Sequence, residues 1–156
     1  GVRLVGSEMC IRDRIQWVKD APDGCVDVII VDSTDPVGPA EGLFNESFYR
    51  ECIRCLGKTG ILVQQSESPL FHEDLILDMH STMRTAGFLN TQTFYFPQCL
   101  YPSGWWSGTM ASMGDLSGFR EADAGARSFE SRYYNVDIHK AAFATPEFMK
   151  RRLAGL

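Results

Sequence analysis

Two aspartates, Asp32 and Asp35, follow directly on an apolar run and carry side chains able to do acid–base chemistry. The run, residues 28–31, is Val-Ile-Ile-Val. An unbroken β-branched run favours a strand that is buried on both faces, as in a parallel sheet with helices on either side. Prolines and a glycine in the next loop exclude a helix directly after this strand. Because ligands of open α/β sheets bind at the carboxyl ends of the strands, the pair predicts a binding or catalytic site.

The same residues also have a structural interpretation. Aspartates in a polar turn, taken alone, are more often turn-forming or helix-capping residues that bond backbone amides. Gln65, at the end of a second apolar run, is by itself more often a backbone-bonding residue, and Tyr101, beside a proline, is more often a packed loop residue. Several further polar and aromatic residues are interpreted as structural, in the core or at an interface: His72, His80, His139, Trp105 and Trp106.

Periodicity and breaker residues predict the elements that position these side chains. Asn45 is a candidate N-cap for a helix to about residue 56, and Gly87 is a stop signal for a helix over 70–86. Residues 61–65 form a second buried strand, so the strand-loop-helix-strand order implies a right-handed crossover and a parallel pair. The remaining expected elements are a helix at 15–19, the first strand at 26–31, a hairpin of strands at 88–97 and 105–113, a partial helix within 114–126, and a closing helix near Pro146.

Composition places the chain among ordinary globular domains. Its 156 residues are enough for one domain with a core, and its net charge of −5 argues against nucleic acid or an anionic membrane as a partner. No apolar stretch approaches the ~20 residues of a membrane span. The five cysteines include a C-x-x-C at Cys52 and Cys55, but no second pair lies nearby, so reduced thiols are expected in place of a zinc site.

Residues 32–41 read Asp-Ser-Thr-Asp-Pro-Val-Gly-Pro-Ala-Glu, which closely resembles the signature of spermidine synthases, the polyamine aminopropyltransferases. Segments 65–69, 101–105 and 133–143 resemble three later motifs of that family in the expected order, so the resemblance covers residues 15–153. It implies a partial doubly wound, Rossmann-like (methyltransferase-type) α/β sheet, mostly parallel with an antiparallel edge hairpin.

The resemblance implies transfer of an aminopropyl group from decarboxylated S-adenosylmethionine to putrescine, giving spermidine and methylthioadenosine. Asp32 would take a proton from the attacking amine, whose reference pKa is ~10.4, and desolvation and Asp35 would make it a stronger base. No metal or permanently bound cofactor is required, because the sulfonium is already a good leaving group. The residues implied to bind the diamine are Asp32, Ser33, Thr34, Asp35, Gln65 and Tyr101, and those implied to bind the nucleoside are Asp13, Pro39 and Ala40.

The family's glycine-rich nucleoside loop, ribose-binding acid and N-terminal β domain correspond to sequence upstream of residue 15. The resemblance therefore implies that residues 15–156 are the C-terminal half of a catalytic domain and are inactive alone. Residues 1–14 resemble a translated adaptor sequence and are expected to be an artefactual or disordered leader. At full length the family implies a cytoplasmic homo-oligomer, a dimer or tetramer, that acts on small molecules.

Two alternatives stay open. The first is a related transferase with another acceptor, such as spermidine, agmatine or cadaverine, because the loops at 65–69 and 98–104 would set acceptor length. The second is a non-catalytic half-domain whose exposed sheet edge associates with other chains.

Overall fold

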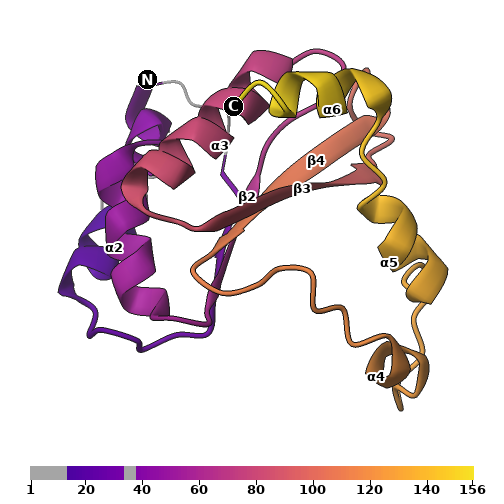
Figure 1. Ribbon diagram of the computed structural model, residues 1–156, viewed down its shortest axis with the longest axis horizontal. Helices are drawn as coiled ribbons and strands as arrows, with labels where there is room; N and C mark the ends of the chain where they lie inside the picture. Colours follow the sequence, from indigo (N-terminus) through magenta and orange to yellow (C-terminus); the bar gives the residue numbers. More distant parts are fainter. Residues whose placement is uncertain (1–13, 34–37) are drawn as a thin grey trace, which may run out of the picture.

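One mixed sheet organises the protein, whose computed structural model describes residues 14–33 and 38–156 (Figure 1). Its described strands are β1 (Val28–Val31), β2 (Ile61–Gln65), β3 (Asn90–Pro97) and β4 (Trp105–Ser112), in the spatial order β1-β2-β4-β3. β1 is parallel to β2, and the other two pairs are antiparallel. The predicted α/β class, parallel crossover and edge hairpin are confirmed. The described sheet is less parallel than the sequence predicts, since the hairpin strand β4 lies directly beside β2.

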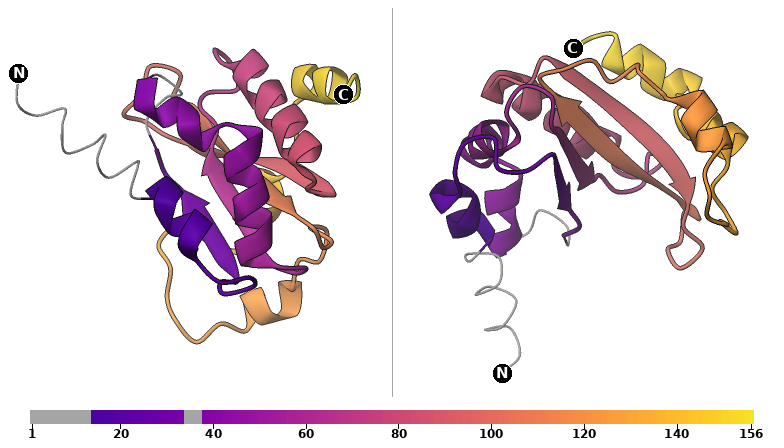
Figure 2. Two further views of the ribbon diagram at one scale, coloured as in Figure 1. Left: turned by 90° about the vertical axis from the view of Figure 1, so that its left-hand side faces the viewer. Right: turned by 90° about the horizontal axis from the view of Figure 1, so that it is seen from below.

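Helices are concentrated on one face of this sheet. Residues 14–20, α2 (Glu46–Leu56) and α3 (Glu73–Ala86) cover that face, and Figure 1 shows α2 and α3 side by side. A 3-10 helix, η1 (Gly38–Leu43), leads into α2. The chain after β4 forms α4 (Glu121–Gly125), α5 (Val136–Ala142) and α6 (Glu147–Leu153), which follow the β3 side of the sheet (Figure 2). None of the described helices is long and apolar enough to cross a lipid bilayer.

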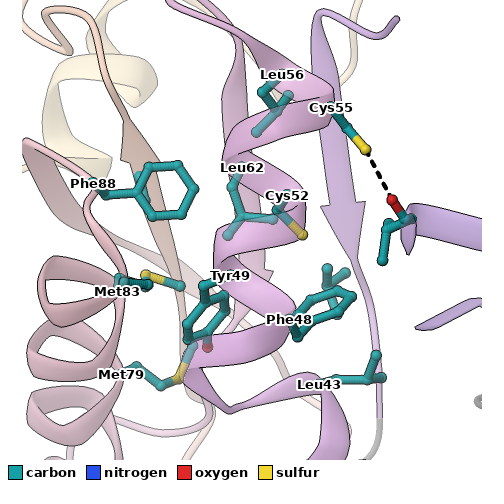
Figure 3. Close-up of a cluster of buried hydrophobic side chains, with 14 of the residues drawn as sticks. Leu43, Phe48, Tyr49, Cys52, Cys55, Leu56, Leu62, Met79, Met83 and Phe88 are labelled. Atoms are coloured by element: carbon teal, nitrogen blue, oxygen red, sulfur yellow. Dashed lines mark hydrogen bonds between the residues drawn. The ribbon is translucent and has the colours of Figure 1, made fainter. Parts of the chain in front are cut away.

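The core lies between the sheet and α2 and α3 (Figure 3). Leu62 of β2 is fully buried there, and Met79 and Met83 of α3 pack toward α2 from the other side. Each large side chain buried in this way contributes about 1.5–3 kcal/mol to stability. The buried inner face of α2 consists of Phe48, Tyr49, Cys52, Cys55 and Leu56. The C-x-x-C pair is thus part of the core, and the described cysteines are free thiols.

The expectation that β1 is buried on both faces is wrong. Val28 and Ile30 are 53% and 73% exposed, whereas Val31 is buried. β1 is an edge of the described sheet, and its helices cover only the face to which Val31 belongs. The apolar side chains of the opposite face have a different surrounding: Ile30 of β1 and Val63 of β2, which are paired in register, line a cavity.

Element boundaries follow local capping chemistry. The Asn45 side chain accepts a hydrogen bond from the Phe48 amide at 2.9 Å, as predicted for an N-cap. Gly87 ends α3 with a φ of 119°, in the left-handed region that favours glycine. α3 begins later than the predicted residue 70, because Ser68 first forms a turn in which its carbonyl accepts from the His72 amide at 2.9 Å. The helix α5, capped by Asn135, was not predicted.

Candidate active site

A cavity opens on the sheet face opposite α2 and α3, toward the carboxyl ends of β1 and β2. It measures about 1250 Å³. Strand alternation places one row of residues under it, in which Gln65 of β2 pairs with Gly108 of β4, and Gly108 pairs with Phe94 of β3. The lining residues used below are Asp32, Ser33, Gln65, Glu67, His72, Phe94, Tyr101, Trp106, Ser107 and Gly108.

The end of β1 brings Asp32 and Ser33 to the cavity, as the sequence predicts. Asp32 is solvent-exposed, so its carboxylate is reachable by water as well as by a ligand. The Ser33 hydroxyl is buried and has no hydrogen-bond partner among the described residues. A buried hydroxyl without a partner loses the hydrogen bonds that it makes in water, which favours a ligand at this point.

The end of β2 brings Gln65 to the same cavity, again as predicted. Its side-chain Nε2 donates a hydrogen bond to Oε1 of Glu67 at 2.6 Å. Its Oε1 is buried and accepts no hydrogen bond from the described residues. Gln65, which lines the cavity, therefore keeps an acceptor without a partner while one of its two donors is already engaged.

Glu67 is a cavity residue that the sequence analysis missed. Its side chain is 3% exposed, and its backbone has a φ of 64°, an unusual conformation for a residue with a side chain. Such a conformation costs on the order of 1–2 kcal/mol and persists where the surroundings hold it. His72, at the start of α3, places Nδ1 4.0 Å from Glu67 Oε2. The signal was present in the sequence, since Glu67 comes two residues after the end of its strand, closer than Asp35 comes after the end of the first strand.

Tyr101 reaches the cavity from the loop between β3 and β4. The loop is closed by hydrogen bonds from the Gly104 amide to the Tyr101 carbonyl at 2.9 Å and from the Gln98 amide to the Gly104 carbonyl at 3.0 Å. The Tyr101 ring stacks on Trp106, with ring centroids 4.3 Å apart. Trp106 is buried, as the core interpretation expected, and it also lines the cavity beneath Tyr101.

Behind the cavity, a buried polar link joins α2, β2 and η1. The Tyr49 hydroxyl donates to Gln64 Oε1 at 2.9 Å, and Gln64 Nε2 donates to the Leu43 carbonyl at 3.2 Å. Burial raises the pKa of Tyr49 above its usual value, so this phenol remains a donor. The link fixes the segment that follows the acidic loop against the strand that carries Gln65.

The other predicted site residues are not part of the described cavity lining. Asp13, Thr34 and Asp35 lie outside the described residues. Pro39 belongs to η1, and Ala40 in the same helix is buried and is not among the described residues that line this cavity. The nucleoside-binding role of Pro39 and Ala40 stays a prediction.

The described lining of the cavity is rich in acceptors. It contains the carboxylate residues Asp32 and Glu67 and the unpartnered amide oxygen of Gln65, together with aromatic rings, but no described lysine or arginine. This combination suits an organic cation, since carboxylates and carbonyl oxygens accept from ammonium groups and aromatic faces attract positive charge. In the described ranges, no group of three or more His, Cys, Asp or Glu side chains is arranged to hold a metal ion.

Fold and cavity together define a class: an α/β protein with a cavity at the carboxyl ends of parallel strands, the place where open α/β sheets bind their ligands. The family is shown by sequence comparison. The model of the spermine/spermidine synthase domain matches residues 6–118, and the chain belongs to this family. The match begins inside the segment 1–14, whose predicted status as a leader stays a prediction.

Individual relatives agree with this assignment. The polyamine aminopropyltransferase of Methylococcus capsulatus is 69% identical over 142 residues, which are 91% of this chain and 50% of the relative. That of Thioalkalivibrio sulfidiphilus is 54% identical over 151 residues, 96% of this chain and 53% of the relative. The chain thus spans about half the length of the curated relatives it matches.

Solved structures give the same result for the fold. A spermidine synthase in complex with the transition state analogue AdoDATO aligns with a TM-score of 0.82 at 32% identity, over 91% of this chain and 49% of that one. The spermidine synthase from Thermotoga maritima aligns with a TM-score of 0.78 at 32% identity, over 91% of this chain and 48% of that one. The methyltransferase-like, Rossmann-type α/β fold predicted from the resemblance is therefore confirmed.

Proposed function

We propose that this cavity is the acceptor half of an aminopropyltransferase site, which passes an aminopropyl group from decarboxylated S-adenosylmethionine to putrescine. One observation carries the proposal: Asp32 and Glu67, which follow two neighbouring parallel strands, line one aromatic-lined cavity together with Gln65, whose amide oxygen has no hydrogen-bond partner among the described residues. A diamine has an ammonium group at each end and an apolar middle. The lining offers acceptors for the ends and rings for the middle.

In this proposal Asp32 is the catalytic base. The amine nitrogen, once deprotonated, attacks the carbon attached to the sulfonium, so that a C–N bond forms as the C–S bond breaks. The electron pair of the broken bond stays on sulfur, which leaves as the neutral thioether of methylthioadenosine. The proton goes to Asp32, whose exposed position lets it pass the proton to water.

The other residues hold the diamine in line with the breaking bond. Gln65 Oε1 accepts from the attacking nitrogen, and Tyr101, fixed by stacking on Trp106, supplies a hydroxyl at the rim. Glu67 accepts from the distal ammonium group at the buried end. Such positioning lowers the barrier because it removes the entropy cost of bringing two reactants together. Asp35, from its place in the motif, is proposed to help bind the same ammonium groups.

The test is spermidine formation from putrescine and decarboxylated S-adenosylmethionine, followed by mass spectrometry. Because the chain spans about half of its relatives, it is assayed alone and in a chimera, in which it replaces the matched half of the Methylococcus capsulatus relative. We expect turnover by the chimera and none by the chain alone. A soluble, folded chimera that makes no spermidine would refute the proposal.

The acceptor is tested in the same assay by competition. Putrescine, cadaverine, agmatine and spermidine are supplied in equal amounts with limiting aminopropyl donor. We expect the putrescine product to dominate. A dominant product from a longer acceptor would keep the aminopropyl transfer and replace the proposed acceptor.

A further inference from the structure

A continuous chain of hydrogen bonds, exposed at its first link and buried from His80 Nε2 onward, runs from α3 across the sheet to the cavity. It begins at Arg84 on α3, whose Nε donates to Thr91 Oγ1 at 3.0 Å, and Thr91 Oγ1 lies 2.8 Å from Nδ1 of His80. On the other side of the imidazole, Nε2 of His80 lies 2.7 Å from Thr93 Oγ1. The chain thus crosses from helix α3 to strand β3 through a histidine that is 1% exposed.

From β3 the chain continues across β4 to the end of β2. Thr93 Oγ1 lies 3.2 Å from Thr109 Oγ1, and Thr109 Oγ1 donates to Ser66 Oγ at 3.0 Å. Ser66 Oγ lies 2.9 Å from Ser107 Oγ. Ser107 Oγ in turn contacts the backbone carbonyls of Glu67 at 2.8 Å and Ser66 at 3.1 Å. The last link therefore holds the backbone of the residue whose φ is 64°.

The direction of every bond follows from this last link. A carbonyl only accepts, so the single proton of Ser107 points to the carbonyls, and Ser66 must donate to Ser107. With its proton used, Ser66 must accept from Thr109, which must accept from Thr93. Thr93 then has no proton left for the imidazole, so Nε2 of His80 carries the proton and donates it. Nδ1 of His80 is the acceptor, filled by the hydroxyl of Thr91, which itself accepts from Arg84.

We propose that this one-directional chain is a positioning device, in which His80, as the Nε2–H tautomer, fixes the strained turn at Glu67. The chain thereby also fixes the Glu67 carboxylate, the group proposed to bind the distal ammonium of the diamine. The part that concerns the diamine rests on the proposed function, whereas the tautomer and the turn do not. Aligned donors polarise one another in a buried network, and a single break leaves a buried group without its partner. His80 and Thr93 are thus positioning residues, because neither is among the described residues that line the cavity.

Burial also keeps this imidazole neutral. Desolvation, and next the nearby charge of Arg84, lower the pKa of His80 to about 4. A protonated ring would direct the Nδ1–H at Thr91, so the hydroxyl proton that fills Nδ1 would have to turn away and lose this acceptor. The neutral Nε2–H form is therefore the one that satisfies all its neighbours.

The first measurement is the tautomer, from long-range proton–nitrogen NMR spectra of the ¹⁵N-labelled 156-residue chain near pH 7. We expect the ¹⁵N chemical shift of an unprotonated nitrogen for Nδ1 of His80 and that of a protonated nitrogen for Nε2. The His80 signals are assigned as those that are missing from the spectrum of His80→Gln. A protonated Nδ1 with a bare Nε2 would overturn the proposal, because the chain would then run in conflict with its carbonyl end.

The second measurement is amide hydrogen exchange across residues 65–68 in matched variants. Thr93→Val breaks the chain at a distance from the cavity, and Thr93→Ser keeps the hydroxyl. Ser112→Ala is the control, since Ser112 is also buried on the same hairpin but donates to the Gly60 carbonyl, before β2. We expect exchange about tenfold faster in Thr93→Val only. Equal exchange in Thr93→Val and Ser112→Ala would refute the proposal.

The third measurement is putrescine affinity by calorimetry. We expect Thr93→Val to weaken binding about tenfold, and Thr93→Ser and Ser112→Ala to keep it close to wild type. An unchanged affinity in Thr93→Val would contradict the anchor role. If the wild-type chain binds no putrescine, the proposed function is at fault, and the tautomer and the exchange rates alone decide the positioning device.

Discussion

The neighbouring strands β1 and β2 each deliver a carboxylate to the cavity, but they hold it in opposite ways. Asp32 follows β1 directly and is exposed, at an edge of the described sheet. Glu67 follows β2, is 3% exposed, and lies in a strained turn. The Ser107 hydroxyl holds this turn by donating a hydrogen bond to the Glu67 carbonyl. The difference matches two tasks. A base must exchange protons with water, whereas an anchor must hold one end of a flexible ligand in a fixed place.

The largest effect is expected from Asp32→Asn in the chimera. Loss of a general base lowers turnover by roughly 10²–10⁴-fold. Because Asp32 is exposed, its replacement should change the free energy of unfolding by less than about 0.5 kcal/mol. Steady-state kinetics and urea unfolding measure the two effects, and Asp27→Asn, at an exposed residue just before the same strand, is the control. Full activity in Asp32→Asn would show that Asp32 is not the catalytic base and would contradict the division of tasks between the two strand ends.

The second effect is a pH dependence of the free energy of unfolding, caused by His80 in the hydrogen-bond chain that ends at Glu67. The pKa of His80 is about 4 in the folded protein and 6.5 for the unperturbed side chain. Between these values the unfolded state binds more protons than the folded state, so stability falls as the pH falls from 6.5 toward 4. The full contribution is about 3 kcal/mol.

That pH effect is isolated by a comparison with His80→Gln, which keeps a donor toward Thr93 and does not titrate. Chemical unfolding of both proteins is measured from pH 7.5 to 4. We expect the wild type to lose stability more steeply than the variant in the acid half of this range. Parallel curves would show that His80 is not buried as a neutral ring.

The third effect concerns Gly108 and Phe94, which lie side by side in the sheet and line the cavity. A Cβ added at Gly108 would lie 2.5 Å from Cζ of Phe94, so an alanine there must push this ring from its place. Overpacking of this kind costs typically 1–3 kcal/mol. We therefore expect Gly108→Ala to lower the melting temperature and to raise the KM for putrescine in the chimera. Gly118→Ala, where an added Cβ meets nothing within 4 Å, is the control.

The smallest effect separates the carboxylate of Glu67 from its backbone strain. Glu67→Gly and Glu67→Ala both remove the carboxylate, but only glycine adopts a φ of 64° without strain. We expect Glu67→Gly to be more stable than Glu67→Ala by about 1 kcal/mol, with putrescine binding lost in both. Equal stability would mean that the turn relaxes and is not strained in the way inferred here.

The β1 end of the site was predictable from sequence, and the β2 end was predictable only in part. Asp32 and Gln65 follow apolar runs, and Asn45 and Gly87 mark helix ends, so short-range rules located them. These rules act over a few residues and need no knowledge of the rest of the fold. They also predicted helices on both faces of β1, which is wrong because Ile30 is exposed and lines the cavity. In the sequence, an apolar residue that lines a cavity gives the same pattern as one that is covered by a helix.

The hydrogen-bond chain was beyond sequence reasoning for a different reason. Its members come from α3, β3, β4 and the turn after β2, and only the register of the hairpin brings Thr93 opposite Thr109. His80 alone was interpreted as a structural residue on a helix face, which is correct as far as burial goes. Nothing in its sequence neighbourhood shows that its ring is linked through several hydroxyl groups to the backbone of a cavity residue. Long-range polar networks depend on tertiary register, and local patterns do not encode it.

The most direct test of the central claim is an NMR titration of the ¹⁵N-labelled chain with putrescine. We predict saturable shifts for Ser33, Gln65, Glu67 and Tyr101, the residues that both strand ends and the β3–β4 loop bring to one cavity. The backbone amides of α4 serve as the control for unspecific attraction, because this helix carries Glu121 and Asp123 and none of its residues lines the cavity. Shifts confined to the cavity would support a single diamine site. Shifts spread equally over acidic surfaces, or none at the two strand ends, would contradict it.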